Sequence, residues 1–263
     1  MSDYSSIEVT CRDGLARVVL NQPERGNPID GAFCRDMRKL AVDLTTRKDL
    51  RAVLITARGR FFSVGGDIKS FAKDRAAVPA IVQDWTTDLH PALARLRRIN
   101  APVIASVHGL VAGGSVSVVA FADVVLSARD TRFTSAFASI GFCADSGSTV
   151  SLSERMGVAR AKRFLMLAET LTADEALAAG LVDFLHDPAE LEAATEAMAH
   201  RLATGPTLAF GAIKRTLRTV NGSTLESQLE DEAQALATIA ASDDAWEGLT
   251  AFGEKRAPNF KGR

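Results

Sequence analysis

The stretch PVIASVHGLVAGGS, residues 102–115, contains the pattern that predicts the fold of the chain. Its apolar run 103–107 reads as a strand, the segment from Gly109 to Gly114 as a turn, and residues 115–121 as the helix that follows. The stretch FFSVGGDIK, residues 61–69, has the same design, because a strand ends there in the paired glycines Gly65 and Gly66 before a helix start. The chain therefore repeats a strand–turn–helix unit whose turn is rich in glycine.

Glycine-rich turns of this kind have a chemical use. Without a side chain the backbone approaches a ligand closely, and the free N–H groups at a helix start attract negative charge. Either turn alone is better explained as a tight turn without a ligand. Two of them could direct two N–H donors at one developing oxyanion, and the pair is a more specific signal.

Strands and helices alternate on both sides of these stretches. Asp13-Gly14 between two apolar runs predicts a hairpin of strands 7–11 and 15–20. Asp30 is a favourable N-cap for a helix that runs to about residue 48. Further strands are expected at 52–56, 123–126 and around Phe133, and a long helix at about 76–99. The order strand, strand, helix, repeated to about residue 170, predicts an α/β core.

The last third of the chain has a different pattern, which is almost wholly helical. Helices are expected at 173–179, 189–203, 206–220, 225–241 and 245–255, separated by breaks that contain Gly, Pro, Asn or Ser. Because alanine-rich helices depend on packing for their stability, these should lie on the core or on a neighbouring subunit.

Composition narrows the class of protein. With 263 residues, 47% of them hydrophobic, the chain can bury a large core in one domain, with or without a small appendage. A net charge of −1 gives no basic footprint for nucleic acid, and no apolar run approaches the roughly 20 residues that span a bilayer. The first residues lack a secretory signal and three spaced cysteines suit reduced thiols, so a cytoplasmic protein is expected. The four histidines lack metal-ligand spacing, which argues against a metal site.

Five ordered segments resemble the crotonase (enoyl-CoA hydratase/isomerase) superfamily, and the resemblance covers nearly the whole chain. It implies an α/β crotonase fold, with a spiral of β-β-α repeats over residues 1–200 and a helical trimerisation region over residues 201–263. It also implies an acyl-CoA thioester as substrate, no further cofactor because coenzyme A is part of that substrate, and a homotrimer or a dimer of trimers. The segments are LNQPERGN at 20–27, FSVGGDIK at 62–69, PVIASVHG through GG at 102–114, ADEA through GLVD at 173–183, and FGEKRAPNF at 252–260.

The resemblance also assigns roles to individual residues. The N–H groups of Gly66 and Gly114 would bind the thioester oxygen and stabilise the enolate formed when a neighbouring C–H loses its proton. The two charged residues among the candidate substrate contacts would meet phosphate groups, although a solvated surface charge is an equally good interpretation of either. The candidate substrate contacts are Arg25, Ser63, Val64, Gly65, Ile68, Phe137 and Lys255.

Two departures from the family pattern decide which reaction is expected. Ser117 and Phe137 stand where hydratases of the family carry the two glutamates that activate water, so hydration by that machinery is not expected. Asp145 stands where family members that move double bonds, including phenylacetate-pathway isomerases, and 4-chlorobenzoyl-CoA dehalogenase carry an aspartate. One carboxylate that moves a proton between two carbons is sufficient for an isomerase.

The environment of Asp145 permits two interpretations. An aspartate followed by Ser146-Gly147 is often only a turn former. Its apolar neighbours, Phe142 and Cys143 among them, predict instead a buried carboxyl group whose pKa is raised from about 3.9 towards neutrality.

His90 is the ambiguous residue. The dehalogenase has a catalytic histidine at the matching place and isomerase-like relatives often carry one, but a structural histidine is commoner in proteins generally. The leading hypothesis is an enoyl-CoA isomerase with Asp145 as proton shuttle and His90 as a further candidate catalytic residue. The alternatives are enoyl-CoA hydratase, then a dehalogenase-like enzyme with an aspartyl nucleophile, and a non-catalytic CoA-ester binding protein. The acyl group has no readable code in the sequence.

Overall fold

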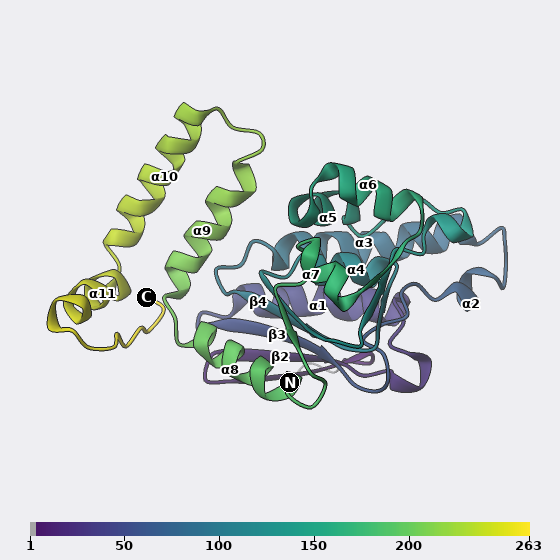
Figure 1. Ribbon diagram of the computed structural model, residues 1–263, viewed down its shortest axis with the longest axis horizontal. Coiled ribbons are helices and arrows are strands. Elements are labelled where there is room, and N and C mark those ends of the chain that lie inside the picture. The colour runs from purple at the N-terminus through teal and green to yellow at the C-terminus, as the bar shows by residue number, and fades with distance from the viewer. Residues whose placement is uncertain (1–3) are drawn as a thin grey trace.

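A computed structural model describes residues 4–263 (Figure 1), and it begins with the predicted hairpin. Strands β1 (Ile7–Arg12) and β2 (Leu15–Leu20) pair antiparallel. Asp13 and Gly14 both have positive φ, 51° and 78°, which suits the tight two-residue turn that joins such strands. The Asp-Gly signal therefore placed this hairpin correctly.

The hairpin forms the edge of a six-stranded sheet. Its order is β1-β2-β3-β4-β6-β9, and every pair after the first is parallel. Neighbouring residues of a strand face opposite layers: Val53 and Ile55 contact one apolar cluster, and Leu54 contacts the other. The further strands are β3 (Ala52–Ala57), β4 (Val103–Val107), β6 (Val124–Ala128) and β9 (Phe184–His186).

A second, three-stranded sheet was only partly expected. It has the order β5-β7-β8, formed by β5 (Leu110–Ala112), β7 (Arg132–Thr134) and β8 (Thr170–Thr172). The segment from Gly109 to Gly114 was predicted as a turn, and that prediction was wrong for its middle. The chain turns at Gly109 and Gly113, where φ is positive, and the three residues between them pair with β7. Strands β8 and β9, of three residues each, were also not foreseen.

The two sheets explain how the chain coils. Strand β4 of the large sheet is followed by β5 of the small one, and β6 is followed in the same way by β7. After β3, Ser63 forms a parallel bridge with Val111 of β5 and so takes the corresponding place beside the small sheet. Each turn of the chain therefore contributes one segment to each sheet before a helix begins, which is the expected β-β-α spiral.

Helices cover both faces of the large sheet. Figure 1 shows α1 (Gly31–Thr46) and α3 (Val78–Leu96) on one side of it and α8 (Leu191–Ala203) on the other. The carboxylate of Asp30 accepts a hydrogen bond of 2.9 Å from the N–H of Phe33, so the predicted N-cap is present. The shorter helices of this part are α2 (Ile68–Phe71), α4 (Gly114–Ala120), α5 (Ser148–Met156), α6 (Val158–Met166) and α7 (Ala173–Ala178).

The last three helices extend away from this core, as Figure 1 shows. They are α9 (Thr207–Thr219), α10 (Leu225–Ala240) and α11 (Asp243–Glu254), each within two residues of its predicted bounds. None of the residues of α10 is buried. No helix in the described part of the chain is both long and apolar enough to cross a membrane.

Candidate functional site

The two glycine turns lie directly against each other. The N–H of Ser63 donates to the carbonyl of Leu110 at 3.0 Å, and the N–H of Ala112 donates back to the carbonyl of Ser63 at 3.0 Å. A methyl group on Gly65 would lie 2.6 Å from the carbonyl oxygen of Ala112 and 3.5 Å from the Cα of Gly113. The turns can meet only because these positions carry no side chain.

This contact leaves two backbone N–H groups without an acceptor. Ile29 pairs with the first turn by donating to Gly65 and accepting from Asp67, so the N–H of Gly66 faces away from it. Gly114 is the first residue of α4, where a backbone N–H has no partner within the helix. Within residues 4–263, no group accepts a hydrogen bond from either N–H. Both glycines line one cavity of about 450 Å³, so two donors are available to a single oxyanion.

Most of the remaining cavity wall is apolar. The ring of Phe71 lies 4.9 Å from that of Trp85 and 5.8 Å from that of Phe142, so α2, α3 and the segment before α5 meet around it. Asp145 is the one carboxylate in the described chain that lines this cavity. The wall therefore suits an apolar acyl group with a single acid or base beside it. Other apolar lining residues are Ile29, Val64, Ile68, Val82, Leu89, Phe137 and Ile140.

The carboxylate of Asp145 is held by side chains. Its Oδ1 lies 2.8 Å from Nε2 of His90, and its Oδ2 accepts a long hydrogen bond of 3.5 Å from the hydroxyl of Ser146. No backbone N–H of the described residues donates to this carboxylate. The backbone carbonyl makes the local turn instead, by accepting from the N–H of Ser148.

The expectation that Asp145 is buried is wrong in this chain. Its side chain is 42% exposed, and that of His90 is 45% exposed. The apolar neighbours on which the expectation rested do not cover it, because Phe142 is itself 40% exposed and Cys143 is also exposed. The predicted burial of this carboxyl group is therefore not found.

His90 approaches Asp145 from α3. If Asp145 is ionised, its carboxylate can only accept, so Nε2 of His90 must carry the proton of this hydrogen bond. The role of His90 was ambiguous from the sequence, and in the structure its ring is hydrogen-bonded to the carboxylate of Asp145. The two residues are 55 positions apart, which is why no local pattern joins them.

The sequence-derived substrate contacts divide into three groups. Val64, Ile68 and Phe137 line the cavity. Ser63 and Gly65 instead support it from behind, because Ser63 is buried and its hydroxyl accepts from the N–H of Gly65 at 3.1 Å.

The two predicted phosphate partners lie outside this cavity. The guanidinium of Arg25 forms ion pairs with Asp30 at 2.6 Å and Asp67 at 2.8 Å. Lys255 caps α11 and is not brought to the cavity within this chain. Sequence analysis thus placed Arg25 near the site but overlooked the carboxylates that engage it.

A neighbouring hollow contains basic residues that sequence analysis missed. A second cavity, of about 580 Å³, shares Val64, Gly66 and Ile68 with the first, and Arg25, Lys69 and Lys73 line it. The four-residue spacing of the two lysines just after the paired glycines was a signal for a basic face. Cys34 was also overlooked as a lining residue. Burial raises the pKa of its thiol to about 12, so it is a poor nucleophile.

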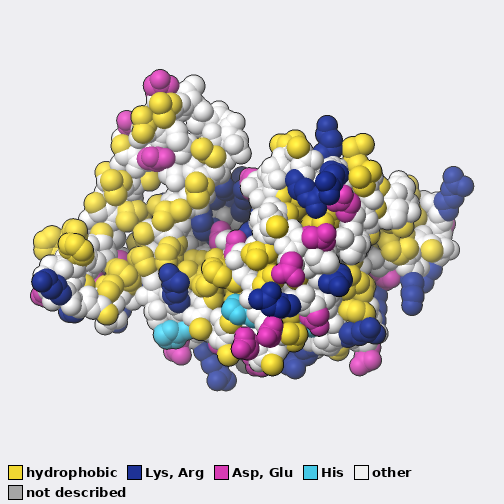
Figure 2. Space-filling view, in the orientation of Figure 1, with side chains coloured by type: hydrophobic (Ala, Val, Ile, Leu, Met, Phe, Trp, Pro, Cys, Tyr) yellow, Lys and Arg dark blue, Asp and Glu magenta, His cyan; other side chains and the backbone are white. Residues whose placement is uncertain are grey.

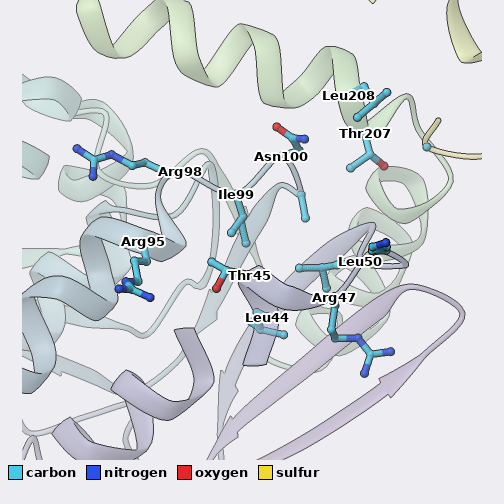
Figure 3. Close-up of a pocket in the computed structure, with 13 residues that line it drawn as sticks. Leu44, Thr45, Arg47, Leu50, Arg95, Arg98, Ile99, Asn100, Thr207 and Leu208 are labelled. Carbon is cyan, nitrogen blue, oxygen red and sulfur yellow. The ribbon is translucent and has the colours of Figure 1, made fainter. Parts of the chain in front are cut away.

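A different cavity, of about 500 Å³, lies where the ends of α1 and α3 meet the start of α9 (Figure 3). Arg47, Arg95 and Arg98 line it, together with apolar residues such as Leu50 and Leu208. It contains neither glycine turn and no carboxylate. In the described part of the chain, no three His, Cys, Asp or Glu side chains gather to hold a metal ion. The cavity at the glycine turns is therefore the candidate active site.

Comparisons with known proteins agree with this geometry. The family model described as enoyl-CoA hydratase/isomerase matches residues 10–263. A protein of Rhodobacter capsulatus named "Probable enoyl-CoA hydratase" is 32% identical over 99% of both chains. The trans-2-decenoyl-[acyl-carrier-protein] isomerase of Streptococcus mutans is 31% identical over 99% of this chain and 100% of the relative.

A solved structure gives the same result for the fold. The crystal structure of an enoyl-CoA hydratase from Polaromonas sp. JS666 superimposes with a TM-score of 0.90 at 25% identity, covering 97% of this chain and 100% of the other. The architecture expected from the five sequence segments is thus confirmed. The chain is an enzyme of the crotonase superfamily and belongs to its enoyl-CoA hydratase/isomerase family.

Proposed function

We propose that this protein is an enoyl-CoA isomerase that moves a double bond along the acyl chain of a coenzyme A thioester. One observation carries the proposal: Asp145 is the only carboxylate among the described residues that line the cavity holding the N–H groups of Gly66 and Gly114. Double-bond migration needs one base and one oxyanion site. The named relatives include a hydratase and an isomerase, so their names do not decide between the two reactions.

The proposed reaction has two proton transfers. The carboxylate of Asp145 takes a proton from the α carbon of a 3-enoyl thioester, and the electrons of that C–H bond delocalise onto the thioester oxygen. The N–H groups of Gly66 and Gly114 stabilise this oxyanion. Asp145 then returns the proton to the γ carbon, the carbonyl re-forms, and the double bond lies between the α and β carbons. His90 orients the carboxylate through its hydrogen bond to Oδ1.

The surroundings suggest how the rest of the substrate binds. The aromatic cluster of Phe71, Trp85 and Phe142 offers an apolar surface to the acyl chain. Lys69 and Lys73, in the adjoining cavity, are suited to the phosphates of coenzyme A. We propose no cofactor beyond the coenzyme A of the substrate and a cytoplasmic location.

Hydration is the weaker alternative because its machinery is missing. Ser117 is fully buried, does not line the cavity, and its hydroxyl donates to the backbone carbonyl of Asp145 at 3.3 Å. Phe137 lines the cavity but cannot activate water. A second carboxylate to hold the water is therefore absent from the described lining of this cavity.

A dehalogenase-like reaction is the second candidate, and the 2.8 Å contact between His90 and Asp145 favours it. In that reaction a carboxylate oxygen of Asp145 attacks the aromatic carbon that bears chlorine, and chloride leaves. Water then hydrolyses the aryl ester, with His90 accepting a proton from the water. Phe137 stands where the dehalogenase of this family has a tryptophan, which counts against this candidate.

One preparation of the enzyme can test all three reactions. Conversion of a 3-enoyl-CoA to the 2-enoyl isomer, hydration of a 2-enoyl-CoA, and chloride release from 4-chlorobenzoyl-CoA are followed by chromatography and ion analysis. We expect isomerisation to exceed hydration by about a hundredfold or more, the low end of the effect of a missing acid or base. Hydration at an equal or higher rate would refute the proposal, and chloride release with an ester on Asp145 would replace it.

The assembly is also a proposal. Eight large apolar residues of α9, α10 and α11 are more than half exposed in the single chain, and further copies of the chain would cover them in a trimer or a dimer of trimers. In such an assembly Lys255 could reach the coenzyme A of another subunit. Light scattering that shows a stable monomer at micromolar concentration would contradict this. The eight residues are Ile213, Leu217, Leu225, Leu229, Leu236, Trp246, Leu249 and Phe252.

A further inference from the structure

A smaller cavity lies behind the pair formed by His90 and Asp145. It has a volume of about 300 Å³ and shares Ser146 with the catalytic cavity. His90 lines the smaller cavity and Asp145 the larger, so their hydrogen bond joins the two walls. Both side chains are partly exposed. The two cavities are therefore neighbours on either side of the proposed base.

The end of α3 gives this cavity a basic wall. His90 and Ala94, one turn apart on α3, both line it, and so does Arg98, which lies in the turn just after the helix ends at Leu96. Arg97 lies beside it, and Arg218 comes from α9 on the opposite side. Figure 3 shows the side chain of Arg98 extending away from Thr207 and Leu208.

Two of these three arginines lack an acidic partner. Arg97 is neutralised by Glu154, whose two oxygens both accept from it. Arg98 and Arg218 form no ion pair within residues 4–263, and Arg218 donates only a long hydrogen bond of 3.4 Å to the carbonyl of Arg97. Figure 2 shows Lys and Arg side chains inside the hollow between α9 and the core.

The positive charge here is unfavourable for the protein alone. Loss of solvent and the neighbouring charges of Arg98, Arg97 and Arg215 lower the pKa of Arg218 from its ordinary value. Lys214, one turn before it on α9, is paired with Asp123 at 2.6 Å, so that carboxylate is already engaged. Crowded guanidinium groups gain most from an anion that can accept two hydrogen bonds, and a carboxylate fits that geometry.

We propose that Arg98 and Arg218 bind a carboxylate at the far end of the acyl chain, so that the preferred substrates are thioesters of coenzyme A with dicarboxylic acids. This inference rests on the proposed function, which puts the thioester carbonyl at Gly66 and Gly114. From there the acyl chain would pass the pair of Asp145 and His90. Ser146 lines both cavities, and we place the passage of the acyl chain from one to the other beside it.

Binding measurements test this without any turnover. Isothermal titration calorimetry on the full chain compares saturated thioesters that end in a carboxylate with methyl-ended thioesters of equal length, over a series of lengths. We expect the carboxylate form to bind about tenfold more tightly or better at the length that spans the two cavities, the value of one or two charge-assisted hydrogen bonds. Equal affinities at every length would overturn the proposal.

Variants then locate the preference. In a double variant, Arg98→Gln with Arg218→Gln, the carboxylate form should bind no better than the methyl form. The matched control is Arg215→Gln, since Arg215 is on the same helix but bonds to Asn100 and does not line this cavity. The control should keep the preference, and thermal unfolding checks that each variant is folded. A preference that survives in the folded double variant refutes the assignment of these two arginines.

These binding measurements, set beside the isomerisation assay of the same preparation, separate this inference from the proposed reaction. If the carboxylate preference is present but 3-enoyl thioesters are not isomerised, the binding site stands and the isomerase proposal falls. If isomerisation is found without the preference, the reverse holds.

Discussion

The two walls of the catalytic cavity are built in different ways. The wall formed by the glycine turns is tied by backbone hydrogen bonds at Ser63, Ile29 and Ala112, and Gly65 has no room for a methyl group. The other wall, residues 136–146, is a loop that contains one short 3-10 helix (Ala138–Ile140), and Phe142 and Cys143 are exposed on it. Ala136 and Ser146, at its two ends, adopt the left-handed region with φ of 54°. The fold therefore fixes the first wall, whereas the second wall carries the side chain of Asp145 on a more exposed segment.

This difference separates two parts of the chemistry. The oxyanion donors of the first wall are backbone groups, so their positions change only if the turn itself changes. The second wall carries Asp145, whose carboxylate is positioned by His90 and Ser146 alone among the described residues. The first wall therefore supplies what any thioester enolate requires, and the second selects the reaction.

The largest effect is expected on the second wall, from Asp145→Asn. The amide has nearly the same shape but cannot accept the substrate proton, so isomerisation should fall by about 10³-fold, within the range for a lost general base. Affinity for a saturated acyl-CoA should change little, because the glycine turns are untouched. Chromatography and calorimetry on the same preparation measure the two effects. Activity within tenfold of the original chain would show that another group is the base.

The second effect concerns the first wall. Gly114→Pro removes the N–H donor and should lower kcat by about 10²–10³-fold. Proline suits the first position of a helix, so α4 should still form. The matched control is Gly114→Ala, which adds a Cβ at the same place, 3.0 Å from the hydroxyl of Ser146, but keeps the N–H. If both variants lose the same activity while folded and still binding acyl-CoA, crowding and not the lost donor is the cause.

The parts of the fold that the sequence predicted are those with local causes. The Asp13-Gly14 hairpin, the Asp30 cap and the C-terminal helices each depend on residues within a few positions of one another, and each was placed to within a few residues. Strands β5, β8 and β9 were missed, and of the four three-residue strands only β7 was expected, around Phe133, because so short a segment carries little readable periodicity. Their pairing depends on distant segments that the spiral brings alongside.

The candidate site follows the same division. The glycine turns could be found from their composition, but the assignment of Gly66, Gly114 and Asp145 to one site came from the family resemblance. The exposure of Asp145 could not be predicted, because it depends on which way Phe142 and Cys143 face once the chain is folded. The contact between His90 and Asp145 and the basic cavity behind it join α3, α9 and the segment before α5, which are far apart in sequence.

A third prediction tests the rigidity of the first wall through stability. Gly65→Ala places a methyl 2.6 Å from the carbonyl oxygen of Ala112 at a φ of +82°, and should cost about 2–4 kcal/mol of unfolding free energy. Gly66→Ala, one residue on, meets nothing closer than 3.7 Å and should cost less than about 1 kcal/mol. Thermal unfolding followed by circular dichroism measures the difference. Equal losses in the two variants would mean that the turn can relax and the wall is not fixed.

The smallest effect, and the most direct comparison of the walls, uses two cysteines that both line the cavity. Cys34 belongs to α1 and is buried, whereas Cys143 is exposed on the loop. Alkylation requires the thiolate. Because burial and the nearby carboxylates raise the pKa of Cys34 to about 12, only roughly one molecule in 10⁴ is ionised there at pH 8. Iodoacetamide should therefore label Cys143 while Cys34 stays unmodified, as peptide mass spectrometry can show.

A saturating acyl-CoA should slow the labelling of Cys143, since the acyl chain would occupy the cavity it lines. Rapid labelling of Cys34 in the folded protein would mean that the first wall opens on the timescale of the experiment, and the contrast between a fixed and an exposed wall would then be wrong.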